Sequence, residues 1–377
     1  MSPHTIRRVL AVTHLWLGLI GGLVFSLLAV SGAIVTFRPQ IATLLSPPAI
    51  ARATCVPLDW NQAQRDIEAA ALAPINRIYA PSGNDPRYHL RMRTDVDAIY
   101  AHVIYDACAG AVLGTVPMAW MDWLVDFHHN FLAGRTGRQF VGLAGLGLFL
   151  SGLGGLLLIL LSRPKVRRLL QIQLSGSARR AMFDLHRTVG TASVVLLLLQ
   201  AFTGLWLCFP QPLRAVLALV APLEAETRAA RGEPSPGPAA GLGDLFAAAQ
   251  RAIPDGVIRE VRMPDGTGNV QVRMWRRGDF RSLGNNVASL DRVTTAVRGL
   301  DVYDTKPGGN RIVQAMSGLH YAEWGGLPYR TLYGFSGAAS LPLFLSGAGY
   351  WWLRTRRRSG VIRTAVGAAD ATAAEPA

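Results

Sequence analysis

The chain has 377 residues, half of them hydrophobic, and its excess of Lys and Arg over Asp and Glu gives a formal net charge of +14. A basic excess is typical of proteins that bind nucleic acid or a membrane surface. A nucleic-acid-binding protein has no use for long uncharged apolar runs. The composition therefore excludes that class and indicates an integral membrane protein with the lipid bilayer as a partner.

Four apolar runs are long enough to cross a bilayer, whose hydrocarbon core of about 30 Å needs about 20 apolar residues in a helix. The first run follows Arg7 and Arg8 as a secretory signal would, but its core is longer than the roughly 7–15 apolar residues of such a signal. We therefore expect it to stay in the mature protein. The four predicted transmembrane helices cover 15–37, 142–161, 188–209 and 331–353.

Basic residues flank these runs on one side of the predicted bundle. They precede the first helix, fill the loop of residues 162–185 and follow the fourth helix from Arg354. Short cytoplasmic loops carry an excess of Lys and Arg, so this side is predicted to be cytoplasmic. Both termini then lie in the cytoplasm of a bacterium. Two large loops lie in the periplasm, outside its inner membrane.

Membrane helices and extramembrane segments are therefore predicted to alternate along the chain, and the tail after about Val361 is predicted to be disordered because it is rich in Ala and has few large apolar residues. The predicted segments are the N-terminus with the first helix (1–37), the first periplasmic domain (38–127), the second helix (128–161), the cytoplasmic loop (162–185), the third helix (186–210), the second periplasmic domain (211–319), the fourth helix (320–353) and the basic, then disordered, cytoplasmic tail (354–377).

Each periplasmic segment is predicted to fold as a small α+β domain. Apolar and polar residues alternate in several short runs, which is typical of half-exposed strands, and clusters of Gly, Pro and Asp separate them. The predicted helices cover 60–72 and 242–252. The predicted strands cover 87–93, 98–105, 257–263, 270–275 and 286–290.

The chain contains three cysteines. Cys55 and Cys108 fall in the same predicted periplasmic segment, where an oxidising environment favours a disulfide. Two free, buried thiols are the alternative, and the sequence does not decide between them. Cys208 ends the third predicted helix and has no partner on its side of the membrane.

Two halves of the chain share one pattern. HLWLG begins at His14 and HRTVG begins at His186, and a Ser-Gly or Thr-Gly pair follows seventeen residues after each histidine. The second and fourth helices both contain Leu-Ser-Gly, and His128 and His320 each stand six residues before a glycine. We therefore expect an internal repeat of two units, each made of a helix, an α+β domain and a second helix.

The repeat, its long insert and the motifs HLWLG, FHHNFLAG and SGLHYAEWGG resemble the PepSY-associated transmembrane proteins over about residues 5–358. Within that family the chain is most similar to the iron-regulated inner-membrane siderophore reductases. The resemblance implies a membrane α-helical bundle of four helices with two small periplasmic α+β PepSY-like domains. Some relatives carry a cytoplasmic flavin reductase domain, which we do not expect after the fourth helix here. The electron donor stays open between a cytoplasmic protein and quinol.

Four of the eight histidines stand at predicted helix ends: His14 and His186 on the cytoplasmic side, His128 and His320 on the periplasmic side. An ionisable group in a membrane helix is costly and usually faces the bundle interior, and neutral imidazole is a good metal ligand. If a twofold axis relates the halves, His14 faces His186 and His128 faces His320. Each pair would then bind the iron of one haem b, which makes two haems.

Simpler interpretations of these residues stay open. A histidine at a helix end is often only an interfacial polar group, and His129 is an alternative to His128 as a ligand. His4, His89 and His102 are expected to be solvated or structural. Glycines either leave room for a flat macrocycle or let helices approach closely, and aromatic residues form either an interfacial belt or a floor for a siderophore. The glycines are Gly18, Gly21, Gly22, Gly152, Gly154, Gly155 and Gly190, and the aromatic residues are Trp120, Trp123, Trp324, Tyr329 and Tyr333.

Three functions fit these observations. The leading hypothesis is an oxidoreductase, a haem b reductase that passes electrons across the bilayer to a ferric siderophore in the periplasm and releases Fe(II). The alternatives are a non-redox PepSY binding or regulatory membrane protein and a component of a siderophore or iron permease. No nucleic-acid partner is expected. No hydrolase, zinc or nucleotide motif stands out, and no catalytic residue is predicted.

Overall fold

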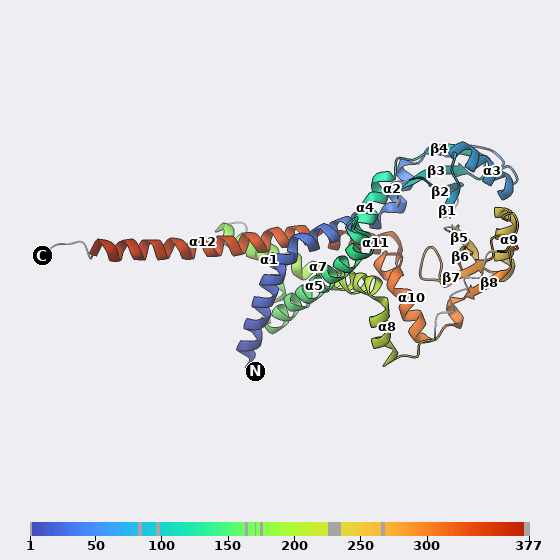
Figure 1. Ribbon diagram of the computed structural model, residues 1–377. Helices are drawn as coiled ribbons and strands as arrows, with labels where there is room; N and C mark the ends of the chain where they lie inside the picture. Colours follow the sequence, from blue (N-terminus) through green and yellow to red (C-terminus); the bar gives the residue numbers. More distant parts are fainter. Residues whose placement is uncertain are drawn as a thin grey trace. The chain divides into compact units, whose positions relative to one another are not determined.

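The structure is a computed structural model that describes residues 2–81, 85–95, 99–162, 165–169, 171–173, 176–224, 235–264 and 268–372. The chain divides into two compact units, which are described separately (Figure 1). The membrane unit holds the long apolar helices and consists of residues 1–33, 135–208 and 332–377. The sheet unit holds all described strands and consists of residues 34–134 and 209–331.

Three helices of the described chain are long and apolar enough to cross a membrane: α1 (Pro3–Thr36), α5 (Gly134–Ser162) and α7 (Ala178–Cys208). The fourth predicted span falls on two helices, α11 (Gly326–Ala338) and α12 (Ser340–Thr372). The break lies just before Pro342, which has no N–H to donate to the preceding turn. A fourth span therefore stays a prediction. A short helix, α6 (Val166–Leu169), lies between α5 and α7.

Close approach explains several of the glycines in the membrane unit, although a Cβ at Gly18 would meet nothing within 4 Å. A Cβ at Gly22 of α1 would lie 2.5 Å from the Phe344 ring of α12, and one at Gly152 of α5 would lie 3.2 Å from Leu198 of α7. Small residues allow such contacts between apolar helices. Polar contacts add to them, since Gln200 of α7 donates to the carbonyl of Tyr333 in α11 at 2.7 Å.

The sheet unit contains one antiparallel sheet of eight strands in the order β4-β3-β2-β1-β5-β6-β7-β8. The first insert, residues 34–134, supplies β1–β4, and the second insert, residues 209–331, supplies β5–β8. The two sets join where β1 pairs with β5, with Ile78 opposite Val261. The strands are β1 (Ile75–Tyr79), β2 (Arg87–Arg93), β3 (Tyr100–Asp106), β4 (Ala111–Thr115), β5 (Val257–Arg262), β6 (Val270–Trp275), β7 (Asn286–Leu290) and β8 (Val297–Asp301).

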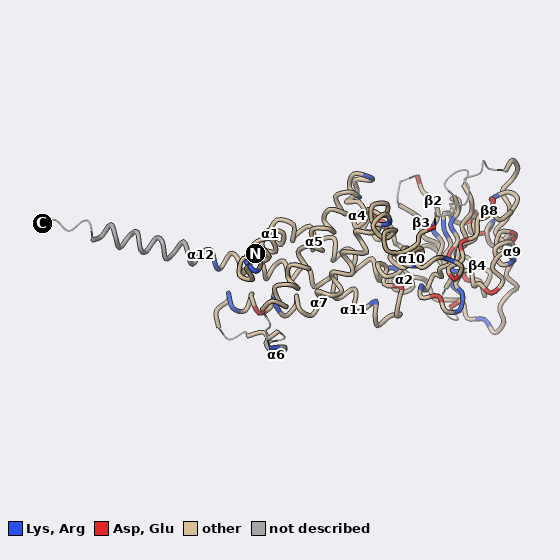
Figure 2. The backbone as a smooth tube through the Cα atoms, turned by 90° about the horizontal axis from the view of Figure 1, so that it is seen from below, with Lys and Arg blue, Asp and Glu red and all other residues tan. Residues whose placement is uncertain are grey.

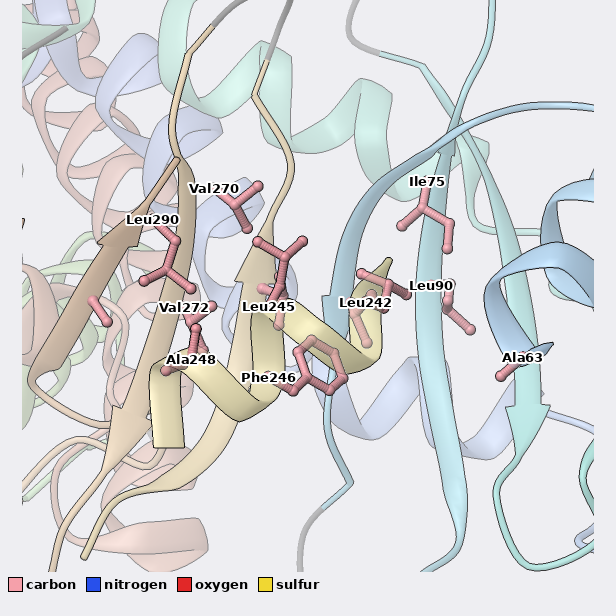
Figure 3. Packing of buried hydrophobic residues seen from close by; sticks show 14 of the residues in the cluster. Ala63, Ile75, Leu90, Leu242, Leu245, Phe246, Ala248, Val270, Val272 and Leu290 are labelled. Atoms are coloured by element: carbon pink, nitrogen blue, oxygen red, sulfur yellow. The ribbon is translucent and has the colours of Figure 1, made fainter. Parts of the chain in front are cut away.

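Seven helical segments in the described part of the chain belong to the sheet unit. Helices α3 and α9 cover one face of the sheet, and their apolar residues pack on strands of both sets (Figure 3). The two predicted α+β domains therefore share one sheet and one core. The segments are α2 (Arg38–Leu45), α3 (Trp60–Ala71), α4 (Ala119–Asn130), α8 (Pro210–Ala218), α9 (Leu242–Ala252), the 3-10 turn η1 (Tyr303–Thr305) and α10 (Gly308–His320).

The sequence pattern locates both core helices and five of the strands but misses β1, β4 and β8. In β1 a bulge between Ile75 and Arg77 breaks the alternation, because Ile75 and Ile78 both enter the core. Strand β4 is short and contains Gly114 at φ +132°. Strand β8 pairs only with β7 at the edge of the sheet and has little apolar signal.

The cysteines and the tail complete the fold. Cys55 and Cys108 form a disulfide, and Cys208 is free. Helix α12 extends to Thr372, into the tail whose composition predicts disorder. The tail is rich in Ala, the strongest helix former. Its last residues, 373–377, lie outside the described part of the chain.

A shared core predicts that the two halves of the sheet unfold together. Leu90 of β2 is fully buried, so Leu90→Ala should lower the free energy of unfolding of the sheet unit by about 2–5 kcal/mol. Hydrogen exchange should then accelerate in β5–β8 as well as in β1–β4. Leu300→Ala, at a half-exposed position of β8, is the control. Faster exchange confined to β1–β4 would contradict the shared core.

Candidate functional site

His14 of α1 and His186 of α7 lie together inside the membrane unit. Their ring centres are 5.9 Å apart and their planes are inclined by 71°. The Nδ1 atom of His14 lies 2.9 Å from the carbonyl oxygen of Ser151, and that of His186 lies 2.9 Å from the carbonyl oxygen of Leu343. A carbonyl can only accept, so Nδ1 carries the proton in both rings. Each Nε2 therefore keeps its lone pair for a ligand.

Helices α5 and α12 hold these two rings with equivalent residues. A Cβ at Gly155 would lie 3.1 Å from Cε1 of His14, and one at Gly347 would lie 3.1 Å from Nδ1 of His186. The carbonyl and the glycine recur with the same offset of 192 residues (151 to 343, 155 to 347), which is also the offset from His128 to His320. The Leu-Ser-Gly motifs have an offset of 195 (150 to 345). The Leu-Ser-Gly motifs therefore identify the correct pair of helices. An alignment of the two halves on these motifs, however, is shifted by three residues from the alignment that matches the histidine contacts.

His128 of α4 and His320, the last residue of α10, lie together inside the sheet unit. Their ring centres are 6.1 Å apart and their planes are inclined by 27°. The His129 ring lies beside His128, with centres 5.9 Å apart and an inclination of 55°. The structure thus brings together both predicted pairs, and it puts His128 opposite His320.

The spacing of the two pairs can be compared with metal ligation. An imidazole nitrogen lies about 2 Å from a first-row metal and the ring centre lies about 1 Å further, so two rings that bind one metal from opposite sides have centres about 6 Å apart. Both observed spacings agree with this value. The described residues contain no group of three or more His, Cys, Asp or Glu suited to a metal ion. A pair of histidines therefore fits a metal whose remaining ligands come from a macrocycle better than a bare ion.

Both histidine pairs lie within the part of the chain that matches a known family. The family model described as PepSY-associated TM region matches residues 11–354. The chain belongs to this family. No curated protein matches the chain. Membership establishes a membrane protein of the PepSY-associated class, and the three apolar helices and the separate antiparallel sheet agree with it.

A buried chain of polar residues in this PepSY-associated protein anchors α4 to the sheet. Nε2 of His89 lies 2.8 Å from Nδ1 of His102, and Nε2 of His102 lies 2.8 Å from a carboxylate oxygen of Asp122. Arg38 donates to the same carboxylate at 2.7 Å. An ionised carboxylate accepts, so His102 donates to Asp122 and accepts from His89. The expected structural role of His89 and His102 agrees with these contacts, whereas Asp122 went unrecognised in the sequence.

The predicted aromatic residues differ in exposure. Trp120, Trp123 and Trp324 are each about half exposed, at 47%, 49% and 53%, whereas Tyr333 is buried. Trp324 packs edge-on against Tyr329, with ring centres 5.6 Å apart. Half-exposed tryptophans suit both an interfacial belt and a binding floor, so both interpretations stay open.

The histidine chain predicts a pH dependence of stability. Burial, with smaller effects of His102 and nearby arginines, lowers the pKa of His89 from 6.5 to about 3. The unfolded chain binds a proton at this residue below pH 6.5, whereas the folded chain does not until about pH 3, so stability falls as the pH is lowered through this window.

Chemical denaturation between pH 7 and pH 4 checks this dependence. The free energy of unfolding of the sheet unit should fall toward acid by at most about 1.4 kcal/mol per pH unit from His89. His89→Gln keeps an N–H donor for His102 but does not titrate, so its curve should be flatter. His4→Gln, at an exposed position, is the control. Identical slopes in His89→Gln and the native protein would exclude His89 as the source.

Proposed function

We propose that this PepSY-associated protein is a haem b reductase of the bacterial inner membrane, which passes electrons across the bilayer to ferric siderophores in the periplasm. The single observation that carries the proposal is the spacing of the two histidine pairs, 5.9 Å and 6.1 Å between ring centres. Each pair would hold one haem iron through its two imidazoles.

The proposed topology has four spans, with α11 and α12 together forming the fourth. Both termini and the basic flanks lie in the cytoplasm, as the excess of Lys and Arg favours, and the two inserts lie in the periplasm. The Cys55–Cys108 disulfide in the first insert supports this side, because disulfides persist in oxidising compartments. In this topology the His14–His186 pair is the inner site and the His128–His320 pair is the outer site.

The roles of the chain's own residues follow from their contacts. The carbonyls of Ser151 and Leu343 fix the tautomer of His14 and His186 and make each Nε2 a better donor to a metal. The helices that carry and surround the inner pair are apolar, and apolar surroundings disfavour a charged imidazole. When bound, haem supplies a one-electron Fe(III)/Fe(II) couple. Because two histidines of the chain would hold each iron, the site would suit electron transfer better than binding of a substrate to the metal.

The reaction needs one electron for each ferric ion. A cytoplasmic protein or quinol supplies it, and the siderophore's Fe(III) takes it up and becomes Fe(II). No bond within the siderophore breaks. The hard oxygen donors of a siderophore hold Fe(II) more weakly than Fe(III), so release of the metal follows from the electron transfer.

A non-redox binding protein is the second candidate. The sheet unit contains a cavity of about 280 Å³ on the side of α3 and α9, lined by Trp60, Tyr88 and Phe246 among others. Its lining combines these aromatic rings with polar residues such as Gln250 and Arg259, a mixture that suits a small ligand or peptide. A protein that remains colourless after expression with ample haem would support this function instead.

Substitution of the histidines tests the pairing. His14→Ala, His186→Ala and the double variant should each lose about half of the haem, because both residues would bind one iron. His14→Ala combined with His128→Ala should lose all of it. Absorption spectra and haem-to-protein ratios of the purified variants measure the loss, with exposed His4→Ala as the control. Equal haem content in the native protein and all variants would reject the proposal.

Substitution of Gly155 tests whether the position of the His14 ring matters for haem binding. In Gly155→Ala the new methyl would lie 3.1 Å from Cε1 of His14, so the ring must move. We expect weaker retention of the inner haem and unchanged retention of the outer haem during purification. Gly308→Ala is the matched control, since a Cβ there meets nothing within 4 Å. Full retention in Gly155→Ala would show that the position of the His14 ring does not matter.

A further inference from the structure

The face of the sheet opposite α3 and α9 carries a row of arginines. Arg91 of β2 lies opposite Arg77 of β1, and Arg77 lies opposite Arg262 of β5. The neighbours on either side of these residues, such as Leu90 and Val261, point into the core. Figure 2 shows Lys and Arg gathered on neighbouring strands of the sheet. Like charges directly opposite each other destabilise a sheet, so this row needs compensating negative charge.

The carboxylate of Glu260 forms ion pairs with two arginines of the row, Arg77 and Arg262. Glu260 is 1% exposed and lies 3.1 Å from Arg77, 3.1 Å from Arg262 and 3.2 Å from Arg273 of β6. Burial alone would raise the pKa of Glu260, but these guanidiniums hold it below the usual value. Burial and the neighbouring Arg281 lower the pKa of Arg273. Positive charge is therefore in excess on this face.

Arg91 receives no share of that carboxylate. It is 8% exposed, and its guanidinium stacks on the Tyr100 ring at 3.6 Å. Its Nε is buried without a hydrogen-bond partner, and within the described ranges no hydrogen bond or ion pair is formed by its guanidinium. A buried cation that lacks an anion is unfavourable. Arg91 is therefore suited to bind an anionic ligand, which would supply the missing negative charge.

The arginine row lies between β3, which contacts α4, and the β6–β7 connection, which contacts α10. Arg91 is directly opposite His102 of β3, which binds Asp122 of α4. Beyond β5, Gln314 of α10 donates to the carbonyl of Asn285 in the β6–β7 connection at 2.7 Å. Helices α4 and α10 carry His128 and His320 near their ends. A ligand on the row would therefore lie on the same face of the sheet as the helix of His128.

We propose that Arg91, with Arg77 and Arg262, binds a carboxylate group of an anionic ferric chelate. A guanidinium binds a carboxylate through two parallel hydrogen bonds, which suits a planar cation stacked on an aromatic ring. This assignment rests on the proposed function and narrows its substrate to chelates that carry negative charge. A haem propionate is the other source of the same carboxylate chemistry, and the experiment separates the two.

Gallium(III) citrate is the probe, because gallium(III) carries carboxylate ligands as iron(III) does but accepts no electron. Its binding to the full chain in detergent is measured by titration calorimetry and does not depend on haem or on a donor. Arg91→Met should weaken binding about 10- to 100-fold, since a charge-assisted pair is lost. Arg65→Met, at an exposed position of α3 on the other face, should bind as the native protein does. An uncharged gallium tris-hydroxamate should show no dependence on Arg91.

A thermal melt of the ligand-free protein separates binding from structure. Arg91→Met removes an unpaired buried charge, so its melting temperature should equal or exceed that of the native protein. A lower melting temperature, or gallium citrate binding equal to that of the native protein, would overturn the proposal. Loss of haem in Arg91→Met, with no citrate binding by the native protein, would assign the carboxylate to a propionate and overturn the chelate assignment. A colourless protein with Arg91-dependent citrate binding would reject the haem proposal and leave this site standing.

Discussion

The hydrogen bond between a histidine Nδ1 and a main-chain carbonyl is the interaction on which the inner site depends. It satisfies one nitrogen of a ring that lies in apolar surroundings and leaves the other without a proton. The Nε2 atoms of His14 and His186 therefore keep a lone pair that can bind a ligand. The same device occurs twice, with Ser151 and Gly155 around one ring and Leu343 and Gly347 around the other.

The outer pair depends on a different constraint. Helix α4, which carries His128, is held to β3 by Asp122 through His102 and Arg38. Helix α10, which ends at His320, is held to the β6–β7 connection by Gln314, and Glu323 just beyond it pairs with Arg281. Because one sheet spans both inserts, it fixes these two helices relative to each other. The shared sheet thus gives the sheet unit a role in positioning the imidazoles of His128 and His320.

Sequence patterns locate the residues whose signal is local or repeated. The two histidine pairs stand out because helix-end residues recur at matched spacings, and α9 because its apolar periodicity is strong. The joining of two inserts into one sheet is not local, since the pairing of β1 with β5 leaves no mark in either strand. The bulge at Ile75 breaks the apolar–polar alternation of β1, because Ile75 and Ile78 both enter the core although they are three residues apart. The alternation therefore does not reveal this strand in the sequence. The sequence does not show that Arg91 lacks an ion-pair partner, because this depends on its neighbours on the adjacent strands, Arg77 and His102.

The most direct test of the paired imidazoles is the electron paramagnetic resonance spectrum of the oxidised, haem-loaded protein. If two imidazoles hold one haem iron, the angle between their planes would set how unequal the iron's π-type d orbitals are. Crossed rings, as for His14 and His186 at 71°, predict a strongly anisotropic low-spin signal, whereas nearly parallel rings, as for His128 and His320 at 27°, predict a rhombic one. One haem at each pair would give both low-spin ferric signals in equal amounts. A high-spin signal, or no ferric haem signal in protein produced with ample haem, would contradict it.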